Sequence, residues 1–178
     1  PVKTLDQYRQ YLSEPAVFGR FGAEALALYP VEQPAQIRRA ISLSFGDSQF
    51  WFGTRGVARA AARAGLPAYR YFFSRKAQGG AGPDPVHGGE MPYVFGDPKL
   101  QASPYTEDDR RISAAMIDTW FRFAATGNPN GGRVNDWPRY DTASEPVWVF
   151  DAAMKVVQGP RNRELDFIGR YDAALQAR

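Results

Sequence analysis

The single histidine of the chain is the residue whose type and setting point most directly to chemistry. His87 lies in Val86-His87-Gly88-Gly89-Glu90, directly after a segment rich in glycine and proline. A neutral imidazole accepts a proton near neutral pH, which suits a general base, and glycines let a backbone approach closely. A solvated loop histidine is the alternative interpretation and the more common role of a lone histidine. His87 is therefore a candidate catalytic base that still needs a nucleophile.

The serines of this chain do not supply that nucleophile in the expected setting. None lies in a G-x-S-x-G sequence. Ser48 comes nearest, in Gly46-Asp47-Ser48-Gln49-Phe50, but the second glycine is missing and helical sequence precedes it. In α/β-hydrolases the serine comes first along the chain, the acid second and the histidine last. We therefore expect a chain with only the histidine to be the end of such a protein, cut from a longer one.

Metal, cofactor and nucleic-acid functions fit the sequence less well. His87 and Glu90 are only two ligands, whereas zinc takes at least three from the protein. Neither G-x-G-x-x-G nor a P-loop sequence is present, and no cofactor is expected. The 178 residues carry a net charge of +3, and the arginines are scattered rather than clustered as nucleic-acid binding would require.

The composition also bears on the cellular setting. No apolar run approaches the roughly 20 residues that span a bilayer. The chain has no cysteine, which excludes disulfides and thiolate metal sites. The compartment stays open, with a secreted or periplasmic location slightly favoured over the cytoplasm.

The elements expected to position His87 follow from hydrophobic periodicity. The first half of the chain predicts helices that begin at Thr4, cover residues 18–28, begin at Ile37, and run from Asp47 to Ala64. The second half predicts two strands, Ala68–Ser74 and Pro146–Phe150, a helix from Thr106 that buries Met116 and Trp120, and a last helix from Arg161 to Leu175. This order fits the edge of an α/β sheet whose remaining strands are missing.

Four stretches resemble the C-terminal part of the type B carboxylesterases, the family that includes cholinesterases and a group of fungal lipases. They are Tyr69–Phe73, His87–Gly96, Trp120–Asn130 and Trp137–Tyr140. The pattern H-G-x-E-x-x-Y-V-F-G followed by F-A-x-T-G-x-P-N is highly specific, and the order and spacing agree. The resemblance covers nearly the whole chain.

The resemblance implies an α/β-hydrolase fold, a mixed sheet flanked by helices, with residues 1–178 as the C-terminal segment of a single domain. It implies a serine ester hydrolase with a Ser-Glu-His triad in which His87 is the catalytic histidine and Glu90 supports it. The serine, the acid and the oxyanion hole would lie upstream, the acid a few residues before Pro1. The partners would be the remaining N-terminal part, on the same polypeptide or a cleaved second chain, and a small-molecule ester. The chain alone is expected to be inactive.

The same fold also occurs in non-catalytic adhesion proteins, which bind partners through their surface and often lack members of the triad. Retention of His87 favours the enzyme over such a binding module.

The family resemblance also implies an ion pair between a helix start and an arginine near the C-terminus. The matching positions are Asp47 and either Arg161 or Arg163, and Arg163 is preferred because it is nearer the apolar stripe that begins at Leu165. A helix cap by Asp47 is a second, compatible interpretation.

Overall fold

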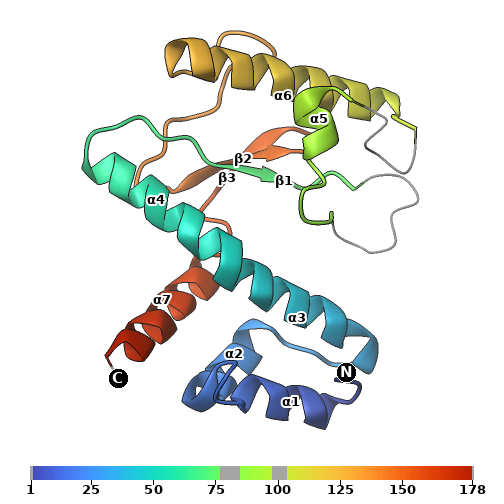
Figure 1. Cartoon of the computed structure of the whole chain (residues 1–178), viewed down its shortest axis with the longest axis vertical. Helices are drawn as coiled ribbons and strands as arrows, with labels where there is room; N and C mark the ends of the chain where they lie inside the picture. The colour runs from blue at the N-terminus through green and yellow to red at the C-terminus, as the bar shows by residue number, and fades with distance from the viewer. Residues whose placement is uncertain (1, 77–84, 98–103, 178) are drawn as a thin grey trace. The chain divides into compact units, whose positions relative to one another are not determined.

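The structure is a computed structural model that describes residues 2–76, 85–97 and 104–177, and it divides into two compact units (Figure 1). Unit 1 combines Pro1–Val57 with Arg161–Arg178, and unit 2 is Ala58–Pro160. The boundary after Val57 does not follow a linker, because it lies inside helix α4 (Phe52–Arg63).

Unit 1 begins with a capped helix, as the sequence predicts. The Thr4 side chain accepts the backbone N–H of Gln7, and the Gln7 side chain accepts the backbone N–H of Thr4, which forms a capping box at the start of α1 (Leu5–Ser13). The short helices that follow are η1 (Gly19–Phe21), α2 (Gly22–Leu28) and η2 (Pro34–Gln36).

One continuous helical run replaces the two helices expected between Ile37 and Ala64. It consists of α3 (Ile37–Gly46), the π-helical turn η3 (Asp47–Trp51) and α4. The prediction that a helix starts at Asp47 is wrong, because Gly46 keeps right-handed helical angles (φ −59°, ψ −41°). The run ends where Gly65 adopts a φ of +73°, the left-handed conformation typical of a helix end.

Helix α7 (Asn162–Gln176) brings the end of the chain into the core of unit 1. Phe167 is fully buried, and its ring meets that of Phe18 edge-on at 5.2 Å. Tyr171 also meets Phe18 edge-on, at 5.3 Å, so this side of α7 faces the segment between α1 and α2.

Unit 2 holds a three-stranded mixed sheet in the order β1-β2-β3 (Figure 1). Its strands are β1 (Tyr71–Phe73), β2 (Pro146–Phe150) and β3 (Lys155–Gln158). β1 runs parallel to β2, with Tyr71 opposite Trp148, so the two predicted strands do share one sheet. β3 is antiparallel to β2. The sequence did not predict it, because the strand has only four residues and these are at most partly buried.

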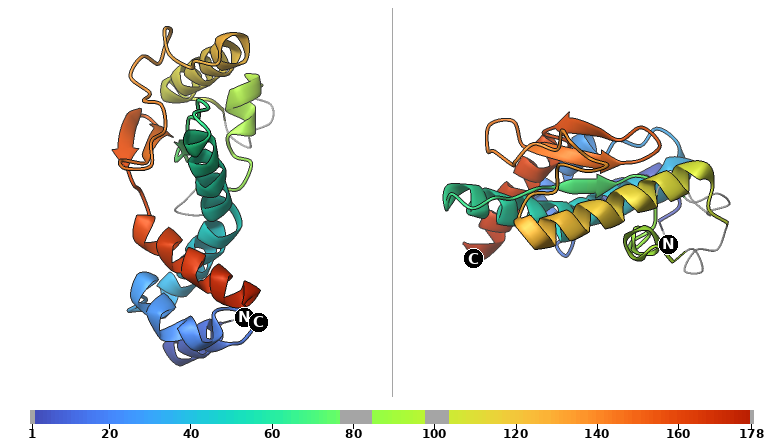
Figure 2. Two further views of the ribbon diagram at one scale, coloured as in Figure 1. Left: turned by 90° about the vertical axis from the view of Figure 1, so that its left-hand side faces the viewer. Right: turned by 90° about the horizontal axis from the view of Figure 1, so that it is seen from above.

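Helix α6 (Glu107–Thr126) runs alongside this sheet, as Figure 2 shows from above. Its buried residues Ile112, Ala115 and Met116 share one core with residues of β1 and β2. A capping box between Thr106 and Asp109 opens it, and Gly127, with a φ of +74°, closes it. Met116 is fully buried in the core of unit 2, whereas Trp120 is only partly buried and meets Phe150 at 5.8 Å. A further helix of this unit is α5 (Met91–Phe95).

Taken with the sheet order, the parallel pairing leaves β1 at the edge of the described sheet, with β2 as its neighbour. Parallel strands are usually buried within larger sheets, so this arrangement is that of a partial α/β fold. No helix in the described ranges combines the length and the hydrophobicity that a bilayer crossing requires.

Candidate functional site

His87 opens a four-residue turn, residues 87–90, that leads directly into α5. The turn follows β1 along the chain, as predicted, and His87 is outside any helix and exposed to solvent. Its imidazole can therefore reach groups that approach from outside the chain.

Two successive glycines hold this turn for different reasons. Gly88 has a φ of +75°, a left-handed conformation that side chains with a Cβ rarely adopt. A Cβ on Gly89 would lie 2.9 Å from the carbonyl oxygen of Val86, which accepts the Gly89 N–H at 3.0 Å. The backbone conformation of the turn that carries His87 therefore requires glycine at positions 88 and 89.

The turn continues into α5 without a break in hydrogen bonding. The Met91 N–H donates to the Gly88 carbonyl at 3.1 Å, and the Glu90 carbonyl accepts the N–H of Tyr93 at 2.9 Å and of Val94 at 3.0 Å. Backbone hydrogen bonds therefore join the residues on both sides of His87 to each other and to α5.

Glu90 lies on the same turn as His87, immediately before α5, and is partly buried. Burial raises the pKa of Tyr71, and the negative charge of Glu90 raises it further.

Helix α5 is anchored through Tyr93, which is almost fully buried. Its hydroxyl donates to Oδ1 of Asp109 at 2.8 Å, and its carbonyl accepts the Ser113 hydroxyl at 2.8 Å. Its ring also lies 4.8 Å from that of Phe73 on β1. Tyr93 therefore ties α5 to both α6 and the sheet.

Asp109 accepts hydrogen bonds from three residues and is itself buried. Arg75 Nε donates to Oδ1 at 2.7 Å, while the N–H and hydroxyl of Thr106 donate to Oδ2 at 2.8 and 2.7 Å. Burial opposes ionisation, but the bonds from Arg75, Thr106 and Tyr93 outweigh it and hold the pKa of Asp109 well below its usual range. We call Arg75, Tyr93, Thr106 and Asp109 the Asp109 cluster.

The predicted ion pair lies in unit 1, and Asp47 binds Arg161 rather than the preferred Arg163. Arg161 Nε donates to Oδ1 at 2.6 Å and Nη2 to Oδ2 at 2.5 Å, while the Tyr29 hydroxyl donates to Oδ2 at 2.8 Å. Burial, and then the charge of Asp47, raises the pKa of Tyr29 well above its usual value.

The preference for Arg163 failed because the two arginines have different backbone settings. Arg161 is the left-handed N-cap residue before α7 and is partly buried, whereas Arg163 lies in the first turn of α7 and is exposed. Asp47 is buried inside a continuous helical run, which removes the alternative that it caps a helix start.

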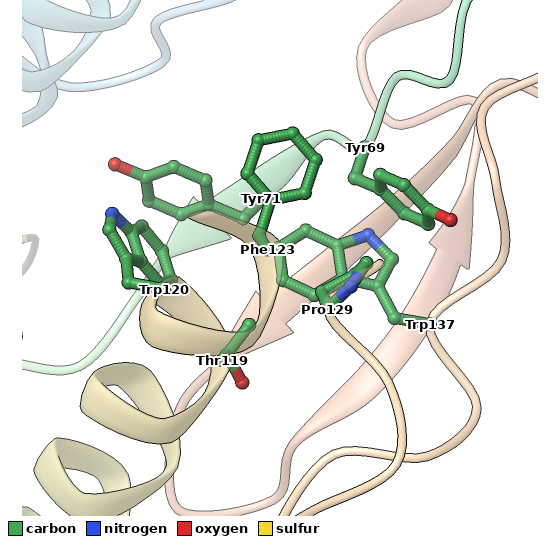
Figure 3. Close-up of a pocket in the computed structure, with 7 residues that line it drawn as sticks. All are labelled: Tyr69, Tyr71, Thr119, Trp120, Phe123, Pro129 and Trp137. Carbon is green, nitrogen blue, oxygen red and sulfur yellow. The ribbon is translucent and has the colours of Figure 1, made fainter. Parts of the chain in front are cut away.

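A second feature of unit 2 is an aromatic pocket of about 190 Å³ beside β1 and the end of α6 (Figure 3). Its lining residues are Tyr69, Tyr71, Thr119, Trp120, Phe123, Pro129 and Trp137. The pocket contains no histidine or carboxylate, and Thr119 Oγ1 is buried without a hydrogen-bond partner among the described residues. It offers apolar contact rather than acid–base chemistry.

Metal binding gains no support from the described geometry. Within residues 2–76, 85–97 and 104–177, no three side chains of His, Cys, Asp or Glu gather into a possible metal site.

A model of the carboxylesterase family matches residues 8–168 of the chain. This chain belongs to the carboxylesterase family. Among its carboxylesterase-family relatives, a fumonisin B1 esterase from Sphingopyxis macrogoltabida is 36% identical in an alignment over 157 residues that covers 82% of this chain. A medium-chain fatty acyl-CoA hydrolase precursor from Anas platyrhynchos is 34% identical in an alignment over 141 residues that covers 76% of this chain.

Solved structures support the same fold for this family member. A PNB esterase superposes on 94% of the chain with a TM-score of 0.70 at 23% sequence identity, and a thermophilic PNB esterase gives 0.69 at 24%. The chain covers 34% of each of these structures, and 28% and 25% of the two relatives above. The architecture is therefore a partial α/β-hydrolase fold.

Sequence reasoning did not anticipate what Tyr93 and Asp109 do. Tyr93 belongs to the stretch that carries the family resemblance, and Asp109 lies three residues after Thr106, the spacing of a capping box. The spacing shows the cap, but nothing in it indicates that Arg75 and Tyr93 reach the same carboxylate.

Proposed function

We propose that this chain supplies the catalytic histidine of a serine carboxylesterase, with His87 as general base. The observation that carries the proposal is the setting of His87: an exposed imidazole on a glycine-fixed turn after β1, within the residues matched by the family model. Loops that follow strands are where α/β enzymes place their reacting groups.

The proposed reaction is hydrolysis of a carboxylic ester by acyl transfer. His87 takes the proton of a serine hydroxyl supplied by the rest of the esterase as that oxygen attacks the ester carbonyl. The protonated imidazole then gives the proton to the departing alcohol. A water molecule, deprotonated in turn by His87, attacks the acyl-enzyme, and the acid is released with the serine regenerated.

The other groups of the proposed triad belong to the remainder of the protein. A carboxylate there would hold the imidazole in the productive tautomer, and backbone N–H groups would stabilise the oxyanion, each worth about 10²–10³-fold in rate. Glu90, on the turn of His87, would support the site without touching the ester. No step requires a cofactor.

The test is His87→Gln in the complete esterase, assayed with p-nitrophenyl acetate. The kcat should fall by several orders of magnitude, because triad members act as a unit (about 10⁶-fold in a serine protease). Val86→Ala, at the neighbouring and 76% exposed side chain, is the matched control and should keep the parental kcat. The kcat of Glu90→Gln should lie between those of His87→Gln and Val86→Ala.

A fall of less than about tenfold for folded His87→Gln would show that His87 is not the base. Absence of any turnover in the complete parental protein would instead support the non-catalytic binding module.

A further inference from the structure

The two ends of the segment that carries His87 meet at a single carboxylate oxygen. Arg75 lies two residues after β1, and Tyr93 lies six residues after His87. Both donate to Oδ1 of Asp109, at 2.7 and 2.8 Å. The flanks on either side of His87 are therefore fixed to the same point at the start of α6.

The second oxygen of Asp109 fixes that point to the backbone. Thr106 donates to Oδ2 through its N–H and its hydroxyl, and Arg75 Nη2 donates to the Thr106 hydroxyl at 3.0 Å. Asp109 and Tyr93 are both only 1% exposed, so solvent does not compete for these bonds. The start of α6 is thus part of the same rigid arrangement.

We propose that the Asp109 cluster positions His87 for catalysis, with Tyr93 and Asp109 as positioning residues that act through the backbone of the 87–90 turn. This inference rests on the proposed role of His87. Because backbone hydrogen bonds join the segment from Val86 to Phe95, we expect loss of the Tyr93 hydroxyl to shift α5 and the imidazole together. A misplacement of about 1 Å can cost roughly 10²-fold in rate.

The first experiment is Tyr93→Phe in the complete esterase, which removes the hydroxyl and keeps the ring that packs on Phe73. The kcat per active site, counted by titration with a serine-directed phosphonate, should fall at least about tenfold, while KM for p-nitrophenyl acetate changes less than about twofold. Titration separates misplacement from unfolding, since a merely structural role would lower the number of active sites and not the kcat of each.

Tyr105→Phe is the matched control. The Tyr105 ring stacks on that of Tyr93 at 5.1 Å, but its buried hydroxyl has no hydrogen-bond partner among the described residues. This variant should keep the parental kcat per site.

A double variant shows whether the cluster acts through His87. In a His87→Gln background, Tyr93→Phe should reduce the residual rate no further, because the group that it positions is gone. An equal reduction in both backgrounds would overturn the inference.

Arg75→Lys covers the case in which Tyr93→Phe does not fold. It keeps the charge at a 16% exposed side chain but loses the planar fork that bonds both Asp109 and Thr106. It should show the same split between kcat and KM, and an unchanged kcat per site would overturn the inference. If His87→Gln itself retains kcat, the proposed function fails instead.

Discussion

At the scale of single residues, two buried aspartates, one in each unit, are bound by the same pair of residue types. Asp47 is bound by an arginine and a tyrosine, Arg161 and Tyr29, and Asp109 by the corresponding pair Arg75 and Tyr93. The arginine contacts join residues 114 and 34 positions apart in the sequence. A buried carboxylate needs such donors because an uncompensated charge in the interior is costly.

The Asp47–Arg161 pair should contribute measurably to stability. Asp47→Asn in the complete protein should cost roughly 3–5 kcal/mol of unfolding free energy, because it removes the bidentate partner of the partly buried Arg161, whose other ion pair, with Glu164, is longer at 3.7 Å. A double-mutant cycle with Arg161→Met, measured by urea unfolding, should give a coupling energy of about 0.5–3 kcal/mol.

Arg163→Met is the matched control for this cycle. Arg163 is exposed and two residues away, so its substitution should change stability by no more than about 0.5 kcal/mol and show no coupling to Asp47. Equal coupling of both arginines to Asp47 would contradict the observed pairing.

At the scale of elements, the same capping box opens two helices in different surroundings. Thr4 caps α1 at the surface through hydrogen bonds with Gln7 alone. Thr106 caps α6 in a partly buried site, and its hydroxyl also contacts Asp109 and Arg75. Substitution of each threonine in turn therefore distinguishes the contribution of a helix cap to stability from that of the Asp109 cluster.

Thr106→Ala should destabilise the protein more than Thr4→Ala. Loss of an exposed cap typically costs about 0.5–1 kcal/mol, and Thr106 should approach about 2 kcal/mol because further buried bonds go with it. Thermal and urea unfolding of the two variants make the comparison. Equal losses would mean that Thr106 acts as a cap only.

The sequence predicted elements well where local chemistry decides the conformation. Thr106, Asp109 and Gly127 mark both ends of α6, and Gly65 marks the end of α4. The prediction failed where contacts distant in the sequence determine the structure. β3 is a strand through its pairing with β2. Gly46 stays within a continuous helix, at a position where a Cβ would meet no atom within 4 Å. The five residues of α5 are too few to show a period.

The candidate site was predicted in the same way. His87 and its glycines could be identified because residue type and spacing are visible in the sequence. Whether Asp47 pairs with Arg161 or Arg163 depends on the direction of each side chain at the start of α7, where Arg161 has a φ of +63°. A left-handed arginine has no sequence signal, and the preference for Arg163 was therefore wrong.

At the scale of the molecule, the chain is a partial fold with its own cores. Each unit has a buried apolar cluster, formed in unit 1 around Phe167 and in unit 2 around Met116 and Phe150. The mixed sheet has three strands, and the chain covers about a third of the solved esterases that it resembles. The proposed reaction therefore depends on groups beyond these 178 residues.

The 178-residue chain alone should not react with a serine-directed phosphonate, whereas the complete esterase should be labelled once per active site. The reason is that no serine here lies in a nucleophile elbow, and Ser48 donates its hydroxyl to the Ser44 carbonyl at 2.8 Å within a helix. Mass spectrometry of the labelled peptides makes the measurement. Stoichiometric labelling of Ser48, or of any other serine in this chain, would mean that the triad has been assigned wrongly.

The division into two units has a spectroscopic consequence. Of the four tryptophans, Trp51 belongs to unit 1, and Trp120, Trp137 and Trp148 belong to unit 2. Trp137 and Trp148 stack at 6.0 Å with their planes 22° apart, close enough for their electronic transitions to interact. Tryptophan emission and near-ultraviolet circular dichroism therefore report mainly on unit 2. Far-ultraviolet circular dichroism also reports on the helices of unit 1. Comparing these signals during unfolding distinguishes loss of the sheet in unit 2 from loss of the helices of unit 1 that hold Asp47.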